Sequence, residues 1–346
     1  MANKILVTGG TGYIGSHTVV ELQNADFEVV IVDDLSNSNI EVLDGIEKIT
    51  KIRPVFEQLD CNDKVGLENL FALHPDIKGI IHFAAGKAVG ESVKQPLKYY
   101  RNNIVSLINL LDLMPLYGIE GLVFSSSCTV YGQPDVLPVT EDTPVRPAIS
   151  PYGNTKQINE EIIRDTIYAG APIKGTILRY FNPIGAHPSA EIGELPIGIP
   201  QNLVPYLTQS AAGMRPVLNV YGNDYNTPDG SCIRDYINVV DLAKAHVIAL
   251  NRILGGYTEV NPEVFNLGTG CGVSVLELIY LFEKTTGVKV PYKIVGRREG
   301  DIEKVWANPT RAHKVLGWTA KETIEDTLIS AWKWQQKIKN CHSLSL

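Results

Sequence analysis

The stretch "VTGGTGYIGS" (residues 7–16) decides the fold of this chain. It contains Gly9, Gly12 and Gly15, follows the short apolar run "KILVTG" and opens a helical pattern over residues 12–25. Glycines allow a tight turn and a close approach of the backbone to a pyrophosphate, whose negative charge then faces the helix N-terminus. The strand–turn–helix context therefore predicts a dinucleotide-binding unit rather than an ordinary glycine turn.

An acidic residue follows at the end of the second apolar run, "EVVIVDD" (28–34). Asp33 lies eighteen residues after Gly15, where a carboxylate can accept hydrogen bonds from an adenosine ribose. A 2′-phosphate would meet like charge at Asp33 and Asp34, so the pattern favours NAD over NADP. The alternative is a structural turn beside a solvated acid.

Short apolar runs alternate with helical patterns through the first half of the chain. Further strands are predicted at 54–60, 79–85, 121–127 and 175–182, and helices at 64–73, 97–117 and 152–169. Uninterrupted apolar strands separated by helices indicate a parallel sheet that is covered on both faces. The fold class predicted is α/β, a doubly wound parallel sheet (Rossmann) with a smaller C-terminal substrate-binding lobe.

The amino-acid composition changes after residue 182, where the segment "NPIGAHPSAEIGELPIGIPQN" is rich in Gly and Pro. Residues 235–250 again read as a strand followed by a helix, which we expect to return to the first lobe. We therefore predict an NAD-binding Rossmann domain over 1–182, joined by about 235–265, and a substrate-binding lobe over 183–340.

The bulk composition excludes several classes of protein. The 346 residues are 44% hydrophobic and 20% charged, as in a globular enzyme, and the formal net charge of -7 argues against a nucleic-acid partner. Five scattered cysteines without a C-x-x-C pair favour a reducing, cytoplasmic compartment. The sequence shows no H-E-x-x-H motif, no signal peptide and no long apolar run, so we expect neither a metal site nor a membrane span.

Two further motifs carry candidate catalytic groups. In "SPYGNTK" (150–156), Tyr152 and Lys156 lie four positions apart, on one face of a helix, where an ammonium can favour the phenolate. In "FSSSCTVYG" (124–132), Ser127 ends a strand at the edge of the sheet where ligands bind. Taken alone, the pair could be a chance helix spacing and the serine a helix cap.

Together with "HFAAGKAVGES", "RYFNPIGAHP", "IRDYINVVDLA" and "RREGD", these motifs resemble the extended short-chain dehydrogenase/reductase family from about residue 3 to about residue 320. Within this family, the motifs most closely resemble those of the members that epimerise UDP-hexoses at C4. It implies NAD as cofactor and the interconversion of UDP-glucose and UDP-galactose by oxidation at C4, rotation of the 4-keto sugar and re-reduction. It also implies a homodimer that packs two helices per subunit, here those at 97–117 and 152–169.

The resemblance assigns roles residue by residue. It implies that the catalytic residues are Ser127, Tyr152 and Lys156. The implied cofactor-binding residues are Gly9, Gly12, Tyr13, Ile14, Gly15, Asp33, Asn37, Ser38, Asp60, Cys61, Phe83, Lys87, Asn102, Tyr152, Lys156 and Tyr180. The implied substrate-binding residues are Lys87, Ser127, Tyr152, Phe181, Asn182, Asn202, Leu203, Asn219, Tyr221, Arg234, Tyr236, Arg298, Asp301 and Val305.

Val305 bears on the choice of substrate. By register from "RREGD", it falls at the family position that borders the sugar pocket near the 2-substituent. A side chain smaller than tyrosine there implies room for an acetamido group, and hence turnover of N-acetylated UDP-hexoses as well. Alternatively, Val305 only packs, or a one-residue slip places Lys304 or Trp306 at this position.

Other readings of the same scaffold stay open to different degrees. A nucleotide-sugar 4,6-dehydratase carries an Asp-Glu pair after the strand-end hydroxyls, whereas this chain has Cys128 and Thr129 there, which argues against dehydration. A UDP-uronate epimerase or another NAD-dependent nucleotide-sugar enzyme is an alternative. A dinucleotide-sensing regulator is the non-enzymatic one, although such proteins usually lose the tyrosine or the lysine that this chain keeps.

Overall fold

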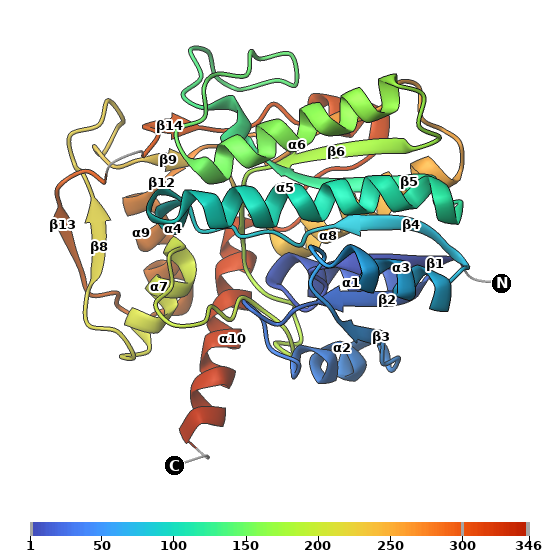
Figure 1. The fold of residues 1–346 in the computed structure, drawn as a ribbon. Helices are drawn as coiled ribbons and strands as arrows, with labels where there is room; N and C mark the ends of the chain where they lie inside the picture. The colour runs from blue at the N-terminus through green and yellow to red at the C-terminus, as the bar shows by residue number, and fades with distance from the viewer. Residues whose placement is uncertain (1–2, 299–300, 344–346) are drawn as a thin grey trace.

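The computed structural model of the chain describes residues 3–298 and 301–343. A parallel sheet with helices on both faces forms the larger lobe. A smaller lobe of short strands and helices lies beyond the carboxyl ends of its strands (Figure 1). Residues 299–300, in the middle of the "RREGD" motif, lie outside the described residues.

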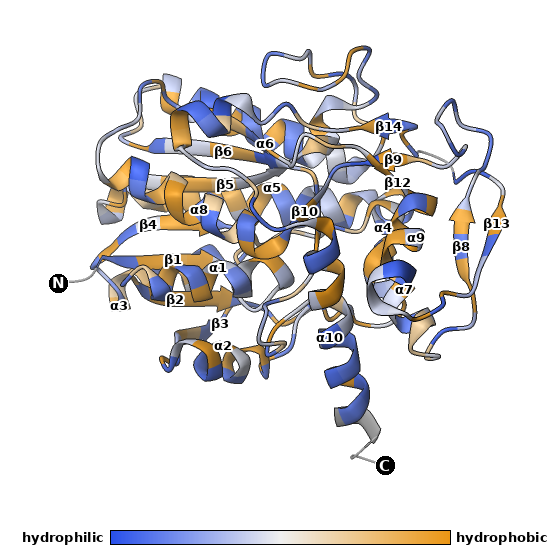
Figure 2. Cartoon of the chain, turned by 180° about the vertical axis from the view of Figure 1, so that it is seen from behind, coloured by the Kyte–Doolittle hydropathy of each residue, from blue (hydrophilic) through white to orange (hydrophobic). Residues whose placement is uncertain are grey.

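The central sheet has seven parallel strands in the order β11-β6-β5-β4-β1-β2-β3. These strands are β1 (Lys4–Thr8), β2 (Glu28–Asp33), β3 (Val55–Gln58), β4 (Ile77–His82), β5 (Gly121–Ser127), β6 (Lys174–Tyr180) and β11 (Glu263–Leu267). Apolar residues fill them because both faces are covered, as the hydrophobic colouring of the strands shows (Figure 2). The strand order reverses between β1 and β4, and the crevice at the carboxyl ends of these strands is where doubly wound sheets bind ligands.

Two layers of helices cover the sheet. One face packs α1 (Tyr13–Asn24), α2 (Val42–Thr50) and α8 (Val239–Leu254) around a core that includes Val19, Ile46 and Leu250. The other face carries α3 (Lys64–Leu73), α5 (Pro96–Leu113) and α6 (Pro151–Tyr168), and α5 and α6 run side by side across the front of the molecule (Figure 1).

The smaller lobe has a core of its own, which includes Leu207, Leu278, Phe282 and Leu328. Its helices are α7 (Leu203–Ala211), α9 (Val275–Thr286) and α10 (Ile324–Ser343). Its strand pairings are β8 (Leu218–Tyr221) with β13 (Tyr292–Val295), and β9 (Ile233–Arg234) with β12 (Val273–Ser274) and β14 (Lys304–Val305). The short pair of β7 (Asn182–Ile184) and β10 (Tyr236–Asn238) continues from β6 and leads into α8.

The predicted doubly wound fold is confirmed, with small differences in the elements. The patterns at 64–73 and 121–127 coincide with α3 and β5, and the pattern at 97–117 divides into α5 and the short helix η1 (Met114–Tyr117). Prediction missed α2 and α4 (Val89–Lys94), two short helices that follow loops rather than long apolar patterns. Strand β11 is part of the central sheet, and helix α8 packs against one of its faces. The domain boundary at residue 182 stays a prediction. Within the described residues, no helix is both long and apolar enough to cross a membrane.

Candidate active site

The glycine loop between β1 and α1 is closed by backbone contacts that exclude other residues. A Cβ atom on Gly15 would lie 2.2 Å from the carbonyl oxygen of Gly9. Gly9 itself has a φ of +71°, and its Cβ would lie 2.8 Å from the amide nitrogen of Ala84 on the loop after β4. Only glycine satisfies both the conformation and the space, so these residues build a surface of bare backbone beside β4.

The first turn of α1 is open to an anion. Its N-cap is Gly12, so no side chain accepts a hydrogen bond from the free amide groups of the first turn. At the end of β2, the Asp33 carboxylate accepts hydrogen bonds from the Thr11 amide (3.2 Å) and the Ser38 hydroxyl (2.9 Å). Bare amides beside a buried acid fit the pyrophosphate and the adenosine ribose of a dinucleotide.

The three predicted catalytic residues come from β5 and α6. Helix α6 begins at Pro151 because the Ser150 hydroxyl accepts a hydrogen bond from the Gly153 amide, which places Tyr152 in the first turn. Ser127 is the last residue of β5 and hydrogen-bonds with Tyr152. All of these side chains are buried. The structure therefore brings the phenol, the hydroxyl and the ammonium of Lys156 into one protected place.

Burial dominates the protonation of this group. It raises the pKa of Tyr152 above its usual value, an effect that the hydrogen bond from Ser127 opposes. Burial also lowers the pKa of Lys156 to about 8, while the nearby Glu160 carboxylate raises it. In the protein alone Tyr152 is thus a neutral phenol at pH 7. It needs added positive charge before it can act as a base.

The direction of the Lys156 side chain differs from the simplest expectation. Its Nζ lies 6.0 Å from the centroid of the Tyr152 ring and donates to the Ser125 carbonyl at 2.7 Å, over the face of Phe124. A buried ammonium requires a hydrogen-bond acceptor. The Ser125 carbonyl on the strand is a better acceptor for it than the neutral hydroxyl of Tyr152. The two side chains share a helix face, yet the lysine is anchored on β5.

Most of the predicted substrate-binding residues line one cavity of 310 Å³ between β7 and the smaller lobe. Nine of them meet there: Asn182, Asn202, Leu203, Asn219, Tyr221, Arg234, Tyr236, Arg298 and Asp301. They come from segments up to 119 residues apart (301 minus 182), which only the fold brings together. Asn182 lies two positions after Tyr180, which is paired in register with Ser127, so this end of the cavity lies beside the ends of β5 and β6.

Two arginines, Arg234 and Arg298, line this cavity together with the carboxylates of Glu194 and Asp301. Arg234 donates to the carbonyls of Ile233 (2.8 Å) and Glu303 (3.5 Å), while Arg298 pairs with Asp301 at 2.6 Å and lies over the Tyr221 ring. The side-chain oxygen of Asn219 is buried without a hydrogen-bond partner in the described residues. Guanidinium groups suit a diphosphate, and an unpartnered amide oxygen suits a ligand that donates to it.

The remaining predicted cofactor residues lie around the crevice. Phe83 and Tyr180 both pack against the buried His246, and Tyr13 donates its hydroxyl proton to the Gly185 carbonyl at 2.7 Å. Asn102 accepts a hydrogen bond from Asn62, next to Asp60 and the buried Cys61 after β3. Their positions are compatible with the roles predicted for them.

Val305, which was predicted to border the sugar pocket, does not line the cavity. It is 2% exposed and packs in an apolar cluster with Phe181, against which Cys128 also packs. The Trp306 ring lies instead against Gly272. A Cβ atom on Gly272 would lie 2.9 Å from this ring. The structure therefore directs Val305, and not its neighbour, toward the strand end that carries Ser127.

Glu194, which sequence reasoning missed, also lines the cavity. Its carboxylate accepts from the Lys87 ammonium (3.3 Å) and from the Asn202 amide (2.7 Å), two residues predicted to bind ligands. Trp334 on α10 donates to the Glu194 carbonyl at 2.9 Å and holds the segment in place. The only sequence signal was its position in the Gly- and Pro-rich segment after residue 182.

Comparison with known proteins agrees with this geometry. A family model described as GDP-mannose 4,6 dehydratase matches residues 6–330. The UDP-glucose 4-epimerase of Bacillus subtilis is 49% identical over 336 residues, which cover 97% of this chain and 98% of that protein.

Two crystal structures of UDP-glucose 4-epimerases have nearly the same fold. That of Stenotrophomonas maltophila, with bound NAD and formylated UDP-arabinopyranose, has a TM-score of 0.94 and 48% identity over 98% of this chain and 99% of that one. That of Bifidobacterium longum, in complex with NAD+ and UDP, has a TM-score of 0.93 and 45% identity over 97% of this chain and 99% of that one.

The family model is named after a dehydratase, but the local chemistry differs from dehydration. The residues after the Ser127 strand end are Cys128 and Thr129, so no carboxylate is attached there to assist the loss of water. The full-length similarity is to enzymes named for epimerisation. The chain belongs to the UDP-glucose 4-epimerase family of the extended short-chain dehydrogenases/reductases.

Proposed function

We propose that this protein is an NAD-dependent epimerase that interconverts UDP-glucose and UDP-galactose. The observation that carries the proposal is the junction of two sites. The cavity lined by nine of the predicted substrate-binding residues begins at Asn182, two positions after Tyr180, and Tyr180 lies close to Tyr152. A dinucleotide on the glycine loop and a UDP-hexose in the cavity would meet at the phenol.

The residues of the chain supply the proton chemistry and the binding. Bound NAD supplies reversible hydride exchange with C4 of the hexose. Tyr152 takes the proton from the C4 hydroxyl, and Ser127 donates to the carbonyl oxygen that develops there. Acting as a base near pH 7 requires a phenol pKa about three units below its value in water, or roughly 4 kcal/mol. The positive charges of Lys156 and of the oxidised nicotinamide favour the phenolate.

Inversion at C4 requires that one part of the substrate stay fixed while another turns. Arg234 and Arg298 hold the diphosphate, and the remaining cavity residues hold the uridine. The 4-keto hexose then turns its opposite face to the same cofactor before re-reduction. Because the cofactor is regenerated in each turnover, slow release is an advantage, and we expect NAD to co-purify with the protein.

A coupled assay tests the function. The purified protein is incubated with UDP-galactose, and in parallel with UDP-N-acetylgalactosamine and a UDP-uronate, and each C4 epimer is quantified. We expect UDP-glucose to form from UDP-galactose and no epimer to form from the uronate. Absence of turnover together with tight NAD binding would favour the dinucleotide-sensing alternative.

Asp33→Ala is expected to raise the affinity for NADP relative to NAD. Removing one carboxylate beside the 2′-phosphate takes away about 1 to 3 kcal/mol of repulsion at intermediate dielectric, so the ratio should rise about 10- to 100-fold. Dissociation constants for both dinucleotides measure it. Asp165→Ala is the control, because Asp165 is exposed on α6 and its loss should leave the ratio unchanged. Wild-type preference for NADP would contradict the role of Asp33.

We also propose that the protein is a cytoplasmic homodimer. The four cysteines whose side chains the structure describes are free, which suits a reducing compartment. The outer face of α5 exposes apolar side chains in a helical stripe: Leu97 is 75% exposed, Val105 36% and Ile108 39%. Since α5 packs beside α6, this stripe belongs to a broad helical surface on which a second copy could pack its own helix pair.

Val105→Glu combined with Ile108→Glu is expected to convert the dimer into a monomer, because two charges would then face the opposing apolar stripe. Sedimentation velocity over a range of concentrations measures the change. Val65→Glu provides the control, since Val65 lies on α3 and is 65% exposed outside this face. A monomeric wild-type protein would refute the proposed interface.

A further inference from the structure

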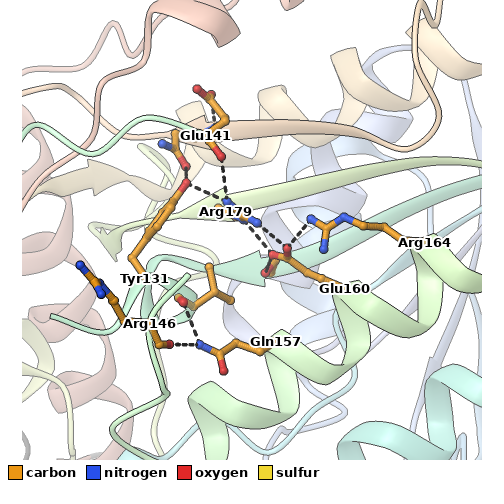
Figure 3. A network of polar contacts seen from close by, with 10 residues as sticks. Tyr131, Glu141, Arg146, Gln157, Glu160, Arg164 and Arg179 are labelled. Carbon is orange, nitrogen blue, oxygen red and sulfur yellow. Dashed lines mark hydrogen bonds and ion pairs between the residues drawn. The ribbon is translucent and has the colours of Figure 1, made fainter. Parts of the chain in front are cut away.

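A buried network of polar side chains connects α6, β5 and β6 next to the catalytic residues (Figure 3). At its centre is Glu160 on α6, whose side chain is 2% exposed. The carboxylate accepts from Ser126 Oγ (2.7 Å), from Arg179 Nε (2.9 Å) and Nη2 (2.6 Å), and from Arg164 Nη2 (2.8 Å). This bidentate, charge-assisted pairing fixes both side chains in one geometry.

The far side of Arg179 extends the network to other elements. Its Nη1 donates to the Tyr131 hydroxyl (3.0 Å) and to the Glu141 carbonyl (3.5 Å). The Tyr131 hydroxyl in turn donates to Asn266 Oδ1 on β11 at 2.6 Å. Arg179 therefore has polar partners on several sides, which is what makes a buried guanidinium tolerable.

The network members are chain neighbours of residues that the reaction uses. Ser126 precedes Ser127, and Arg179 precedes Tyr180. Glu160 lies one helical turn after Lys156 on the same face of α6. None of the network side chains has a part in the mechanism described above, yet together they hold the strands and the helix that carry it.

We propose that Glu160 and Arg179 form a positioning pair for the epimerisation, in which Glu160 supplies the negative charge that keeps Lys156 protonated and Arg179 balances and fixes that charge. The inference rests on the proposed function. Lys156 must be an ammonium to favour the phenolate of Tyr152, and it is buried where an ammonium is poorly solvated. A fixed carboxylate one turn away offsets that loss without blocking the ligand crevice.

The surroundings of Lys156 support this assignment. The groups that face Lys156 are Tyr152 and Glu160 on α6, Phe124 and the Ser125 carbonyl on β5, and His82 on β4. The groups that face Glu160 are Arg164, Arg179 and Ser126. Burial and the nearby ammonium lower the pKa of His82 to about 3, so this ring is neutral. Glu160 is the group that raises the pKa of Lys156 against its burial.

The test uses two substitutions with opposite expected signs. Lys156 is active while protonated, so kcat should fall as the pH rises through its pKa. Glu160→Gln leaves an unbalanced Arg179 nearby and should move this alkaline limb of the pH profile down by on the order of one pH unit. Arg179→Met removes one of the two guanidinium groups that pair with Glu160 and should move the limb up. A purely structural role would lower activity in both variants without opposite shifts.

Variants that keep the fold make the test decisive even if a single buried charge is not tolerated. Glu160→Gln/Arg179→Met removes both charges, and the limb should still move down because Glu160, one turn along the same helix, is the one of the two that acts on Lys156. Arg164→Ala removes the half-exposed partner of Glu160 and should move the limb up slightly. Glu161→Gln, on the exposed side of the same helix, is the control and should leave the limb unchanged.

A second readout separates this inference from the proposed function. Lysine labelled at its ε-carbon is titrated by nuclear magnetic resonance in the wild type and the variants, and Lys156→Met assigns the signal. A lower midpoint for Lys156 in Glu160→Gln, or in the double variant, supports the pair whether or not UDP-galactose is turned over. An unchanged midpoint, or shifts in the same direction in the Glu160 and Arg179 variants, would overturn it. A wild type inactive toward UDP-galactose would overturn the proposed function alone.

Discussion

Tyr152→Phe is expected to lose epimerase activity about 100- to 10,000-fold while the protein remains folded and binds NAD. The substitution removes only the hydroxyl that exchanges a proton with the sugar. The ring stays in its buried place at the start of α6, so packing is retained. The hydroxyl interacts with Ser127, and the substitution leaves that serine in its place at the end of β5.

Turnover of UDP-galactose, thermal unfolding and the amount of co-purified NAD measure this prediction together. Tyr168→Phe is the matched control, because Tyr168 ends the same helix and is 94% exposed. It should behave as the wild type in all three measurements. Near wild-type turnover by Tyr152→Phe would show that another group is the base, whereas loss of NAD or of stability would point to a structural role.

Val305→Tyr is expected to lose turnover of UDP-N-acetylgalactosamine about 10- to 100-fold while UDP-galactose turnover changes little. Val305 is buried in the cluster that holds Phe181, and we expect a tyrosine there to push Phe181 into the space that the sugar needs. Overpacking of this kind typically costs about 1 to 3 kcal/mol. We expect this free-energy cost to fall on the substrate with an acetamido group on C2, because that group requires the space. A hexose without the group does not require it.

Kinetic constants of wild type and variant with both sugar nucleotides decide the question, and the melting temperature monitors the fold. Val305→Ala is the control, since a smaller side chain should keep both substrates. Equal losses with both substrates would mean that Val305 only packs the cluster. A wild type that does not accept the N-acetylated sugar would mean that other walls limit the pocket.

Prediction from sequence was most successful where the chemistry depends on short spacings. The turn around Gly9 and Gly15, the acid at the end of β2 and the Tyr152–Lys156 pair each span a few residues or one strand–helix unit. Backbone conformation and helical periodicity determine such spacings locally. The same reasoning recognised the parallel sheet, because buried strands between helices read as uninterrupted apolar runs.

The sequence by itself therefore determined the doubly wound dinucleotide fold and placed Tyr152 and Lys156 on one helix. The resemblance added the roles proposed for these residues and the set of residues that meet in the cavity. Only the tertiary structure decided that Lys156 is anchored on the Ser125 carbonyl, that Glu194 bridges Lys87 and Asn202, and that Glu160 pairs with Arg179. The physical reason is that a buried polar group takes its partner from whichever distant segment the packing brings within hydrogen-bond range. Sequence spacing contains no record of that choice.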